Sequence, residues 1–254
     1  MNERLLPAAT FIALLLGWEL LVRVANIPHY TLPAPSLVLK TLVDNFGSFA
    51  PSWWFTLKIT FLSLALACVG GVLIAALFAL SRRLEVALFP VAVVLQVTPV
   101  VAIAPLILIY VQSTTAALLL CTWIVAFFPI LANTLVGLRS ADPHLRDLFR
   151  LYRATPLQRL KLLLVPSALP YFIAGLKISG GLSLIAAVTA EMVAGAAGKE
   201  TGLASRIFEA SFRTDTPKMF AGLALLAVSG VLIFWAFNAL SRMLLGRWHA
   251  SQHD

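Results

Sequence analysis

Six long apolar stretches dominate this sequence and set the strongest limit on its fold. A helix that crosses a lipid bilayer needs about 20 mostly apolar residues. Stretches of that kind lie at about 5–25, 56–80, 86–111, 115–138, 167–193 and 219–240. Hydrophobic residues make up 60% of the 254-residue chain and charged residues only 12%, whereas a soluble domain carries roughly 25% charged residues. The sequence therefore predicts an all-α integral membrane protein with six transmembrane helices, formed as one domain over residues 1–254.

The first stretch contains charges, which raises the question of a signal peptide. Arg4 precedes the apolar run, and Glu19 and Arg23 lie one turn apart within it. No small-residue cleavage site follows the run, so we expect it to remain as a spanning helix, with cleavage as the alternative. The polar stretch after it predicts a short amphipathic helix around residues 37–43.

A polar segment, Arg139–Pro170, stands out between the apolar stretches. Its basic residues are Arg139, Arg146, Arg150, Arg153, Arg159 and Lys161, and its acidic residues are Asp142 and Asp147. Apolar residues recur at helical spacing on both sides of Pro156, which cannot donate a helix hydrogen bond. The pattern predicts two short amphipathic helices with a sharp bend between them, in a loop at 139–166. Such a loop can dock a soluble partner, and a solvated loop or a helix on the lipid surface are the alternatives.

The distribution of basic residues predicts the orientation of the chain. Six spans place both termini on one side of the membrane, and that side also holds the 139–166 loop with its concentration of arginine. Because cytoplasmic loops carry an excess of Lys and Arg, we expect the loop and both termini to be cytoplasmic.

Polar residues inside the spans are candidates for a transport pathway. The prolines at 90, 99 and 105 interrupt the third stretch, and prolines are tolerated there where neighbouring helices or a cavity satisfy the freed carbonyls. The predicted pathway residues are Gln96, Thr98, Asn133 and Ser179. Hydrogen bonding between helices of one protomer is the alternative for each of them. Glu191 near the end of the fifth span is predicted to hold an outer gate by accepting hydrogen bonds from backbone or from Arg206.

Two short motifs resemble functional sites but lack essential residues. Gly198-Lys199-Glu200 has no Ser or Thr after the lysine and no earlier glycine, so the sequence predicts no phosphate loop. His249 and His253 have a spacing that could bind a metal, but no third ligand accompanies them, so no metal site is predicted.

No nucleophile and base are evident within the spans, which argues against a membrane enzyme and predicts no catalytic residue. An autonomous secondary transporter remains an alternative, although no internal repeat is evident.

Four motifs stand outside the 139–166 loop: LPAPS (32–36), TPVVAIAPLI (98–107), FFPILANTLVGL (127–138) and AEMVAG (190–195). Together with the loop, these motifs resemble the inner-membrane permeases of ABC importers of the nitrate/sulfonate/taurine type, a branch that includes importers of thiamine-precursor pyrimidines and riboflavin. The loop resembles the EAA loop of these permeases, with Asp147 in place of the usual glutamate and Arg153 in place of the usual glycine.

This resemblance implies a type I importer permease that passes a small solute into the cytoplasm across a bacterial inner membrane. The expected partners are a second copy of the chain, two ATPase subunits and an external substrate-binding protein, with no nucleic acid. ATP and Mg would bind the ATPase, and no cofactor is expected in this chain. The expected substrate is a nitrate-, sulfonate- or taurine-type anion or a heteroaromatic vitamin precursor.

The resemblance also implies a coupling helix near Arg153–Gln158. The residues expected to couple to the ATPase are Asp147, Leu148, Phe149, Tyr152, Arg153, Ala154, Thr155, Pro156, Leu157 and Pro166.

Overall fold

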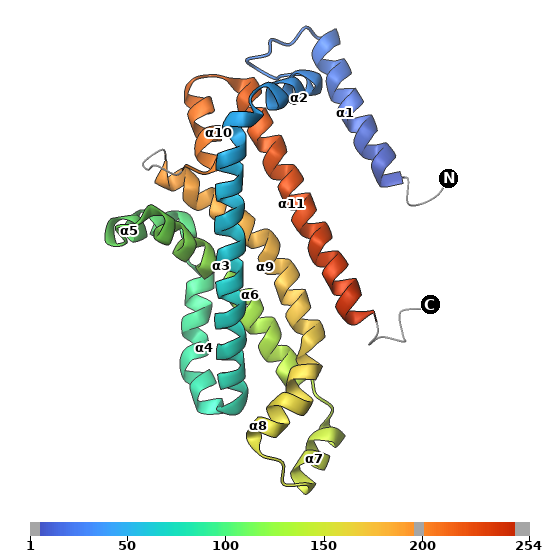
Figure 1. The fold of residues 1–254 in the computed structure, drawn as a ribbon, viewed down its shortest axis with the longest axis vertical. Coiled ribbons are helices and arrows are strands. Elements are labelled where there is room, and N and C mark those ends of the chain that lie inside the picture. Colours follow the sequence, from blue (N-terminus) through green and yellow to red (C-terminus); the bar gives the residue numbers. More distant parts are fainter. Residues whose placement is uncertain (1–5, 196–200, 247–254) are drawn as a thin grey trace. The chain divides into compact units, whose positions relative to one another are not determined.

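The computed structural model describes residues 6–195 and 201–246, which form helices joined by turns, with no strand among them. Arg4, Gly198-Lys199-Glu200, His249 and His253 lie outside these described residues. An all-helical membrane architecture, as the sequence predicted, is confirmed (Figure 1).

Five helical runs are long and apolar enough to cross a membrane. They are α1 (Leu6–Val24), α3 (Phe46–Leu80), α6 (Thr114–Arg139), the continuous run of α8 (Pro156–Arg159), the π-helical turn η1 (Leu160–Leu164) and α9 (Val165–Ala194), and α11 (Thr216–Leu245). Three of these runs extend beyond the predicted spans. α3 begins ten residues before the predicted start at Thr56 and contains Pro51, and α11 continues past residue 240. The run that begins at Pro156 starts well before the predicted residue 167.

The predicted third span is two helices rather than one. α4 (Arg82–Val97) and α5 (Val100–Tyr110) meet at an angle of 100°, so the chain has six spans only if this bent pair is counted as one. The break lies at Thr98 and Pro99, both of which have extended backbone conformations. A residue before proline is biased away from the helical region, which explains the break at this point. Pro90 and Pro105 lie inside α4 and α5 and do not end them.

The chain forms two compact units, each considered by itself. The first unit consists of Met1–Thr56 and Gly195–Ser229. It contains α2 (Pro35–Asp44), which confirms the short helix predicted around residues 37–43, and the short helix α10 (Leu203–Phe212). Its core is formed by Val38, Phe49, Leu203, Ile207, Ala221 and Leu225. Polar contacts also hold this unit together. The Thr56 hydroxyl accepts a hydrogen bond from the Leu203 amide at 2.9 Å, and the Trp53 indole donates to the Ser229 hydroxyl at 2.7 Å.

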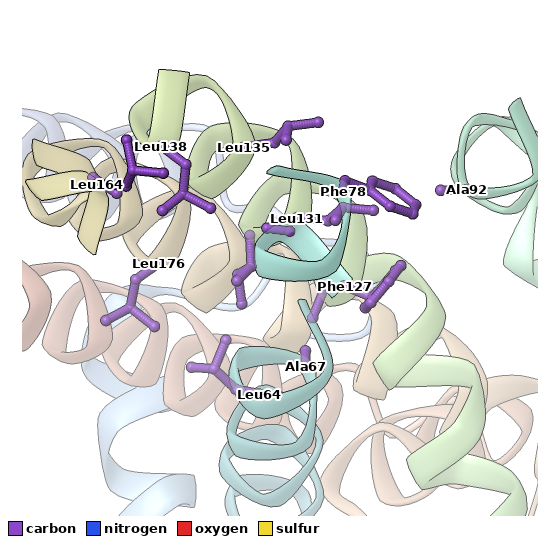
Figure 2. Close-up of a cluster of buried hydrophobic side chains, with 14 of the residues drawn as sticks. Leu64, Ala67, Phe78, Ala92, Phe127, Leu131, Leu135, Leu138, Leu164 and Leu176 are labelled. Carbon is purple, nitrogen blue, oxygen red and sulfur yellow. The ribbon is translucent and has the colours of Figure 1, made fainter. Parts of the chain in front are cut away.

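The second unit consists of Leu57–Ala194 and Gly230–Asp254, and α6 and α9 make its most extensive helix–helix contact. Figure 2 shows the buried cluster around this pair, to which α3, α4 and η1 also contribute. Its labelled residues are Leu64, Ala67, Phe78, Ala92, Phe127, Leu131, Leu135, Leu138, Leu164 and Leu176. α7 (Pro143–Leu151) lies in the connection between α6 and the α8–η1–α9 run.

Glycines allow α6 and α9 to approach closely. A Cβ atom on Gly175 of α9 would lie 2.8 Å from the Pro129 carbonyl oxygen and 3.0 Å from the Asn133 Cβ, both on α6. A Cβ atom on Gly137 of α6 would lie 2.8 Å from the Ala168 Cα atom of α9. Small residues at a helix contact in a membrane bring the two backbones together. The α6–α9 pair is therefore held by backbone contact that larger side chains would prevent.

Gly175→Ala should destabilise the permease by about 1–3 kcal/mol, because the new methyl group meets a backbone carbonyl that cannot move aside. Gly181→Ala on the same helix is the matched control, since a Cβ atom there meets nothing within 4 Å. The thermal midpoint of the purified permease in detergent measures both effects. An equal midpoint for the two variants would show that the glycine contact between α6 and α9 does not limit stability.

Candidate functional site

The loop between α6 and α9 begins with the short helix α7 (Pro143–Leu151), whose start is well defined. The Asp142 carboxylate accepts a hydrogen bond from the His144 amide at 2.7 Å, and Pro143 occupies the first helical position. Both features are typical of helix starts. Asp147, the residue in place of the family glutamate, is exposed and pairs with Arg150 one turn later at 3.3 Å. α7 is thus a stable element of nine residues and not a solvated coil.

α7 ends in a Schellman motif centred on Arg153. The Ala154 amide donates to the Phe149 carbonyl at 3.0 Å, and the Arg153 amide donates to the Arg150 carbonyl at 2.9 Å. This pattern requires a left-handed residue just after the helix, which is usually glycine. Arg153 occupies that position with φ of 49°. The structure therefore explains why glycine is expected here, and the substitution by Arg153 keeps the turn while placing a side chain in a strained conformation.

The next helix, α8, begins three residues after Arg153, and Thr155 is its N-cap. The Thr155 hydroxyl accepts from the Gln158 amide at 3.2 Å, and the Gln158 side chain accepts from the Thr155 amide at 2.8 Å. This capping box is followed by Pro156 in the first turn of α8. Only residues 152–155 separate α7 from α8, so two local hydrogen-bonded motifs fix the direction of the bend.

The residues of the expected coupling helix near Arg153–Gln158 lie at the bend between α7 and α8. Those residues form the turn and the start of α8, and α8 continues through η1 into α9 without a break. The isolated short helix of the loop is α7. The π turn explains how the long helix tolerates Pro166. Proline cannot donate to a carbonyl four residues back, and a wider turn, in which the Val165 amide donates to the Leu160 carbonyl, precedes it.

The predicted coupling residues divide into an inward and an outward set. Phe149 packs against the buried cluster of the second unit. In contrast, Tyr152 is 80% exposed, Leu157 is 70% exposed and Leu148 is also exposed. Leu151, which the sequence did not single out, is 81% exposed. We call Leu151, Tyr152 and Leu157 the apolar tip of the loop. Leu151 could have been identified as a coupling candidate from its position in the last turn of α7, next to Tyr152.

A second feature that the sequence did not reveal lies where the loop meets the spans. Glu85 of α4 is buried, and its carboxylate pairs with Arg82 at 2.8 Å and with Arg139 at the end of α6. Arg146 of α7 donates in turn to the Arg139 carbonyl. These contacts connect the α3–α4 turn, the end of α6 and α7. In the sequence, Glu85 is one of several charged residues between the second and third apolar stretches, and nothing there indicates this link between distant segments.

The predicted pathway residues have different environments. Gln96 is exposed near the end of α4. Thr98 donates to the Val94 carbonyl at 2.7 Å, and Asn133 donates to the Pro129 carbonyl of its own helix at 2.7 Å. Ser179 is fully buried and donates to the Ala126 carbonyl of α6 at 2.7 Å. Ser179 thus has the interhelical bond that was its alternative role.

The predicted gate residue Glu191 lies near the end of α9 and is buried, with 1% of its surface exposed. Arg206, suggested by the sequence as its hydrogen-bond donor, pairs with Glu209 at 3.3 Å, and its Nε donates to the Ser52 hydroxyl at 3.3 Å. Gly195, close after Glu191, has φ of 63°, a left-handed conformation that suits glycine.

Comparison with known proteins gives consistent matches over most of the chain. The family described as "Binding-protein-dependent transport system inner membrane component" matches residues 67–246. The formylaminopyrimidine transport permease protein ThiX of Halalkalibacterium halodurans is 34% identical over 251 residues, which cover 98% of each chain. The riboflavin transport system permease protein RibX of Chloroflexus aurantiacus is 33% identical over 250 residues, which cover 95% of this chain and 89% of the relative. In fold, the chain resembles a solved amino acid ABC transporter chain with a TM-score of 0.65 and 18% identity, covering 81% of this chain and 96% of that one.

Arg153→Gly should stabilise the permease by about 1 kcal/mol, because glycine adopts the left-handed conformation without a steric penalty. Arg153→Ala is the control, since it removes the same charge but keeps a Cβ atom. The two variants are compared by thermal denaturation of the purified protein. If Arg153→Ala raised the thermal midpoint as much as Arg153→Gly, the loss of charge, and not the backbone conformation, would explain the effect.

Proposed function

Because the chain belongs to the family of binding-protein-dependent transport system inner membrane components, we propose that the apolar tip of its 139–166 loop docks the ATPase that drives transport. The chain is the permease subunit of an ABC transport system. A permease of this kind works with a separate ATPase subunit and a substrate-binding protein. The ATPase subunit is the enzyme and this chain is not, so the membrane-enzyme alternative does not apply.

The observation that supports this docking site is the exposure of Leu151, Tyr152 and Leu157 on a strongly charged loop. The same loop carries Asp147 and Arg150, both largely exposed, and charged side chains are costly inside a bilayer. The loop therefore lies outside the hydrocarbon, where the strongly exposed apolar side chains of the tip mark a protein contact. Aromatic and aliphatic anchors of this type dominate the binding energy of protein interfaces.

The apolar tip is also suited to transmit movement. Leu151 and Tyr152 end α7, whereas Leu157 is the second residue of a helix that continues through η1 into α9. Coupling between distant sites needs contiguous packed elements with a defined geometry. Displacement of the tip would move α9 along its length, and Phe149, packed into the buried cluster, would carry α7 with it.

The assembly follows the family resemblance. We propose two copies of this chain, two ATPase subunits below them and one binding protein on the opposite side. ATP and Mg would bind the ATPase subunits, with no cofactor in this chain. The loop and both termini would face the cytoplasm, in agreement with the excess of basic residues on that side. Glu85 and the arginines around it would then lie at the cytoplasmic ends of the spans.

For the pathway, Gln96, Thr98 and Asn133 remain proposed lining residues, and Glu191 remains the proposed gate. Gln96 is exposed on α4 just before the bend into α5, as expected for a residue that faces another protomer or a cavity. Single cysteines at 96 and 133, with position 179 as the buried control, are compared by labelling with a soluble thiol reagent during nucleotide cycling. Labelling at 179 as fast as at 96 and 133 would reject the assignment.

For the gate, Glu191→Gln should lower uptake and raise basal ATP hydrolysis in an intact complex. Normal uptake with normal hydrolysis would leave Glu191 no gating role.

For the substrate, we propose a heteroaromatic vitamin precursor. The two relatives described above are named for formylaminopyrimidine and riboflavin transport, and both match nearly the whole chain. The transporter, reconstituted with its binding protein, should take up a labelled aminopyrimidine. Uptake of an aliphatic sulfonate or nitrate instead would assign the anion class.

Tyr152→Ala should reduce the amount of ATPase that co-purifies with the permease by at least about tenfold, because truncation of an interface anchor typically costs 2 kcal/mol or more. Phe212→Ala is the matched control. Phe212 is also a strongly exposed aromatic residue, at the end of the short helix α10. Equal ATPase recovery in both variants would contradict the proposed docking site.

A further inference from the structure

A pocket of about 280 Å³ lies where the 139–166 loop meets the ends of α3, α4 and α6. Its charged lining consists of five arginines and one carboxylate: Arg82, Arg139, Arg146, Arg150, Arg159 and Glu85. We call it the arginine pocket. It is separate from the apolar tip, because neither Leu151 nor Tyr152 nor Leu157 lines it.

The single carboxylate leaves part of this positive charge uncompensated. One oxygen of Glu85 accepts from Arg82 at 2.8 Å, and the other pairs with Arg139. Arg150 pairs with Asp147, which lies outside the pocket lining. Among the described residues, Arg146 and Arg159 have no carboxylate partner. Within the described residues, the pocket therefore has two guanidinium groups without a carboxylate partner and no further carboxylate in its lining to neutralise them.

Arg146 shows this imbalance at the level of one atom. Its terminal nitrogen donates to the Arg139 carbonyl. Its Nε is buried and has no hydrogen-bond partner within the described part of the chain. A buried donor without a partner is destabilising, and more so when it belongs to a charged group. The half-buried Arg159 lines the same pocket. An anion that accepted hydrogen bonds from both side chains would remove this cost.

We propose that the arginine pocket binds a phosphate group, supplied either by an anionic phospholipid headgroup or by free phosphate. The planar guanidinium fork matches phosphate geometry and forms strong, charge-assisted hydrogen bonds. At about 280 Å³ the pocket is just smaller than the ~300–1,000 Å³ typical of small-molecule sites, which suits an anion of headgroup size. Phe78, Leu138 and Leu164 also line it and belong to the buried apolar cluster, so a polar group here lies at the edge of the spans.

A bound phosphate would have a structural consequence beyond charge balance. Arg82 belongs to α4, Arg139 to α6, Arg146 to α7 and Arg159 to α8. An anion held by several of them would connect the loop to the ends of the spans. Basic pockets at the cytoplasmic ends of transmembrane helices are suited to lipid headgroups. The phosphate would thus stiffen the base of the loop without entering the transport pathway.

The test uses the purified full-length permease in a neutral detergent, titrated with inorganic phosphate at constant ionic strength. Phosphate should raise the thermal midpoint of the wild type by ligand stabilisation of the folded state. Arg159→Gln should weaken the phosphate affinity about tenfold or more, and Arg146→Gln should have the same effect. Arg83→Gln is the matched control, because Arg83 lies beside Arg82 on α4, is exposed and does not line the pocket; it should respond as the wild type does.

A second arm identifies the source of the phosphate. The same proteins are placed in nanodiscs of phosphatidylcholine, with and without phosphatidylglycerol. A midpoint increase with phosphatidylglycerol that is lost in Arg159→Gln assigns a lipid headgroup, and a response to inorganic phosphate alone assigns the free ion. No difference between Arg159→Gln and Arg83→Gln with either probe would overturn the proposal. Loss of ATPase binding in Arg159→Gln, with an unchanged phosphate response, would also overturn it and assign the pocket to carboxylates of the ATPase.

Discussion

The close contact between α6 and α9 is the constraint on which the rest of the second unit depends. Gly175 lies against the Pro129 carbonyl, Gly137 lies against Ala168, and Ser179 donates across the contact to Ala126. In lipid, apolar side chains gain little by leaving their surroundings, so close packing and interhelical hydrogen bonds hold such a pair together. The end of α6 and the start of the α8–η1–α9 run are therefore fixed relative to each other, and the loop between them has a defined base.

The loop itself gains its shape from local motifs. A Schellman motif at Arg153 ends α7, and a capping box at Thr155 starts α8, with four residues between the two helices. Phe149 attaches α7 to the buried cluster, while Leu151 and Tyr152 remain exposed. A loop defined in this way can present apolar side chains to a partner at little cost in conformational entropy. The continuity of α8 with α9 then provides a direct route from the loop into a spanning helix.

Local sequence patterns predicted the elements that depend on local physics. The apolar runs, the short helix around residues 37–43 and the bend before Pro156 follow from periodicity and proline chemistry. Three prolines interrupt the third span in the sequence, but only Pro99 breaks the helix. Which proline a helix tolerates depends on the groups around it, and sequence periodicity does not contain that information.

The features that could not be predicted arise from contacts between distant segments. Ser179 was a pathway candidate because it is polar within a span, yet its hydroxyl is used by α6. Glu85 lies in the first turn of α4, and its pairing with Arg139 depends on how α4 and α6 pack. Pro166 was expected to end the loop before the fifth span, but the π turn carries the helix through it. In each case the residue type was informative, but its partner lay more than 50 residues away or in an irregular turn.

The most direct measurement of the central claim is site-specific photo-cross-linking from α7 in the assembled transporter. A photoreactive residue at position 151 points out from the apolar tip, whereas one at position 149, on the same helix, replaces a side chain that packs against the buried cluster. The docking site described here predicts a cross-link to the ATPase subunit from position 151 and none from position 149. Cross-linking only to lipid from position 151, or to the ATPase equally from both positions, would contradict it.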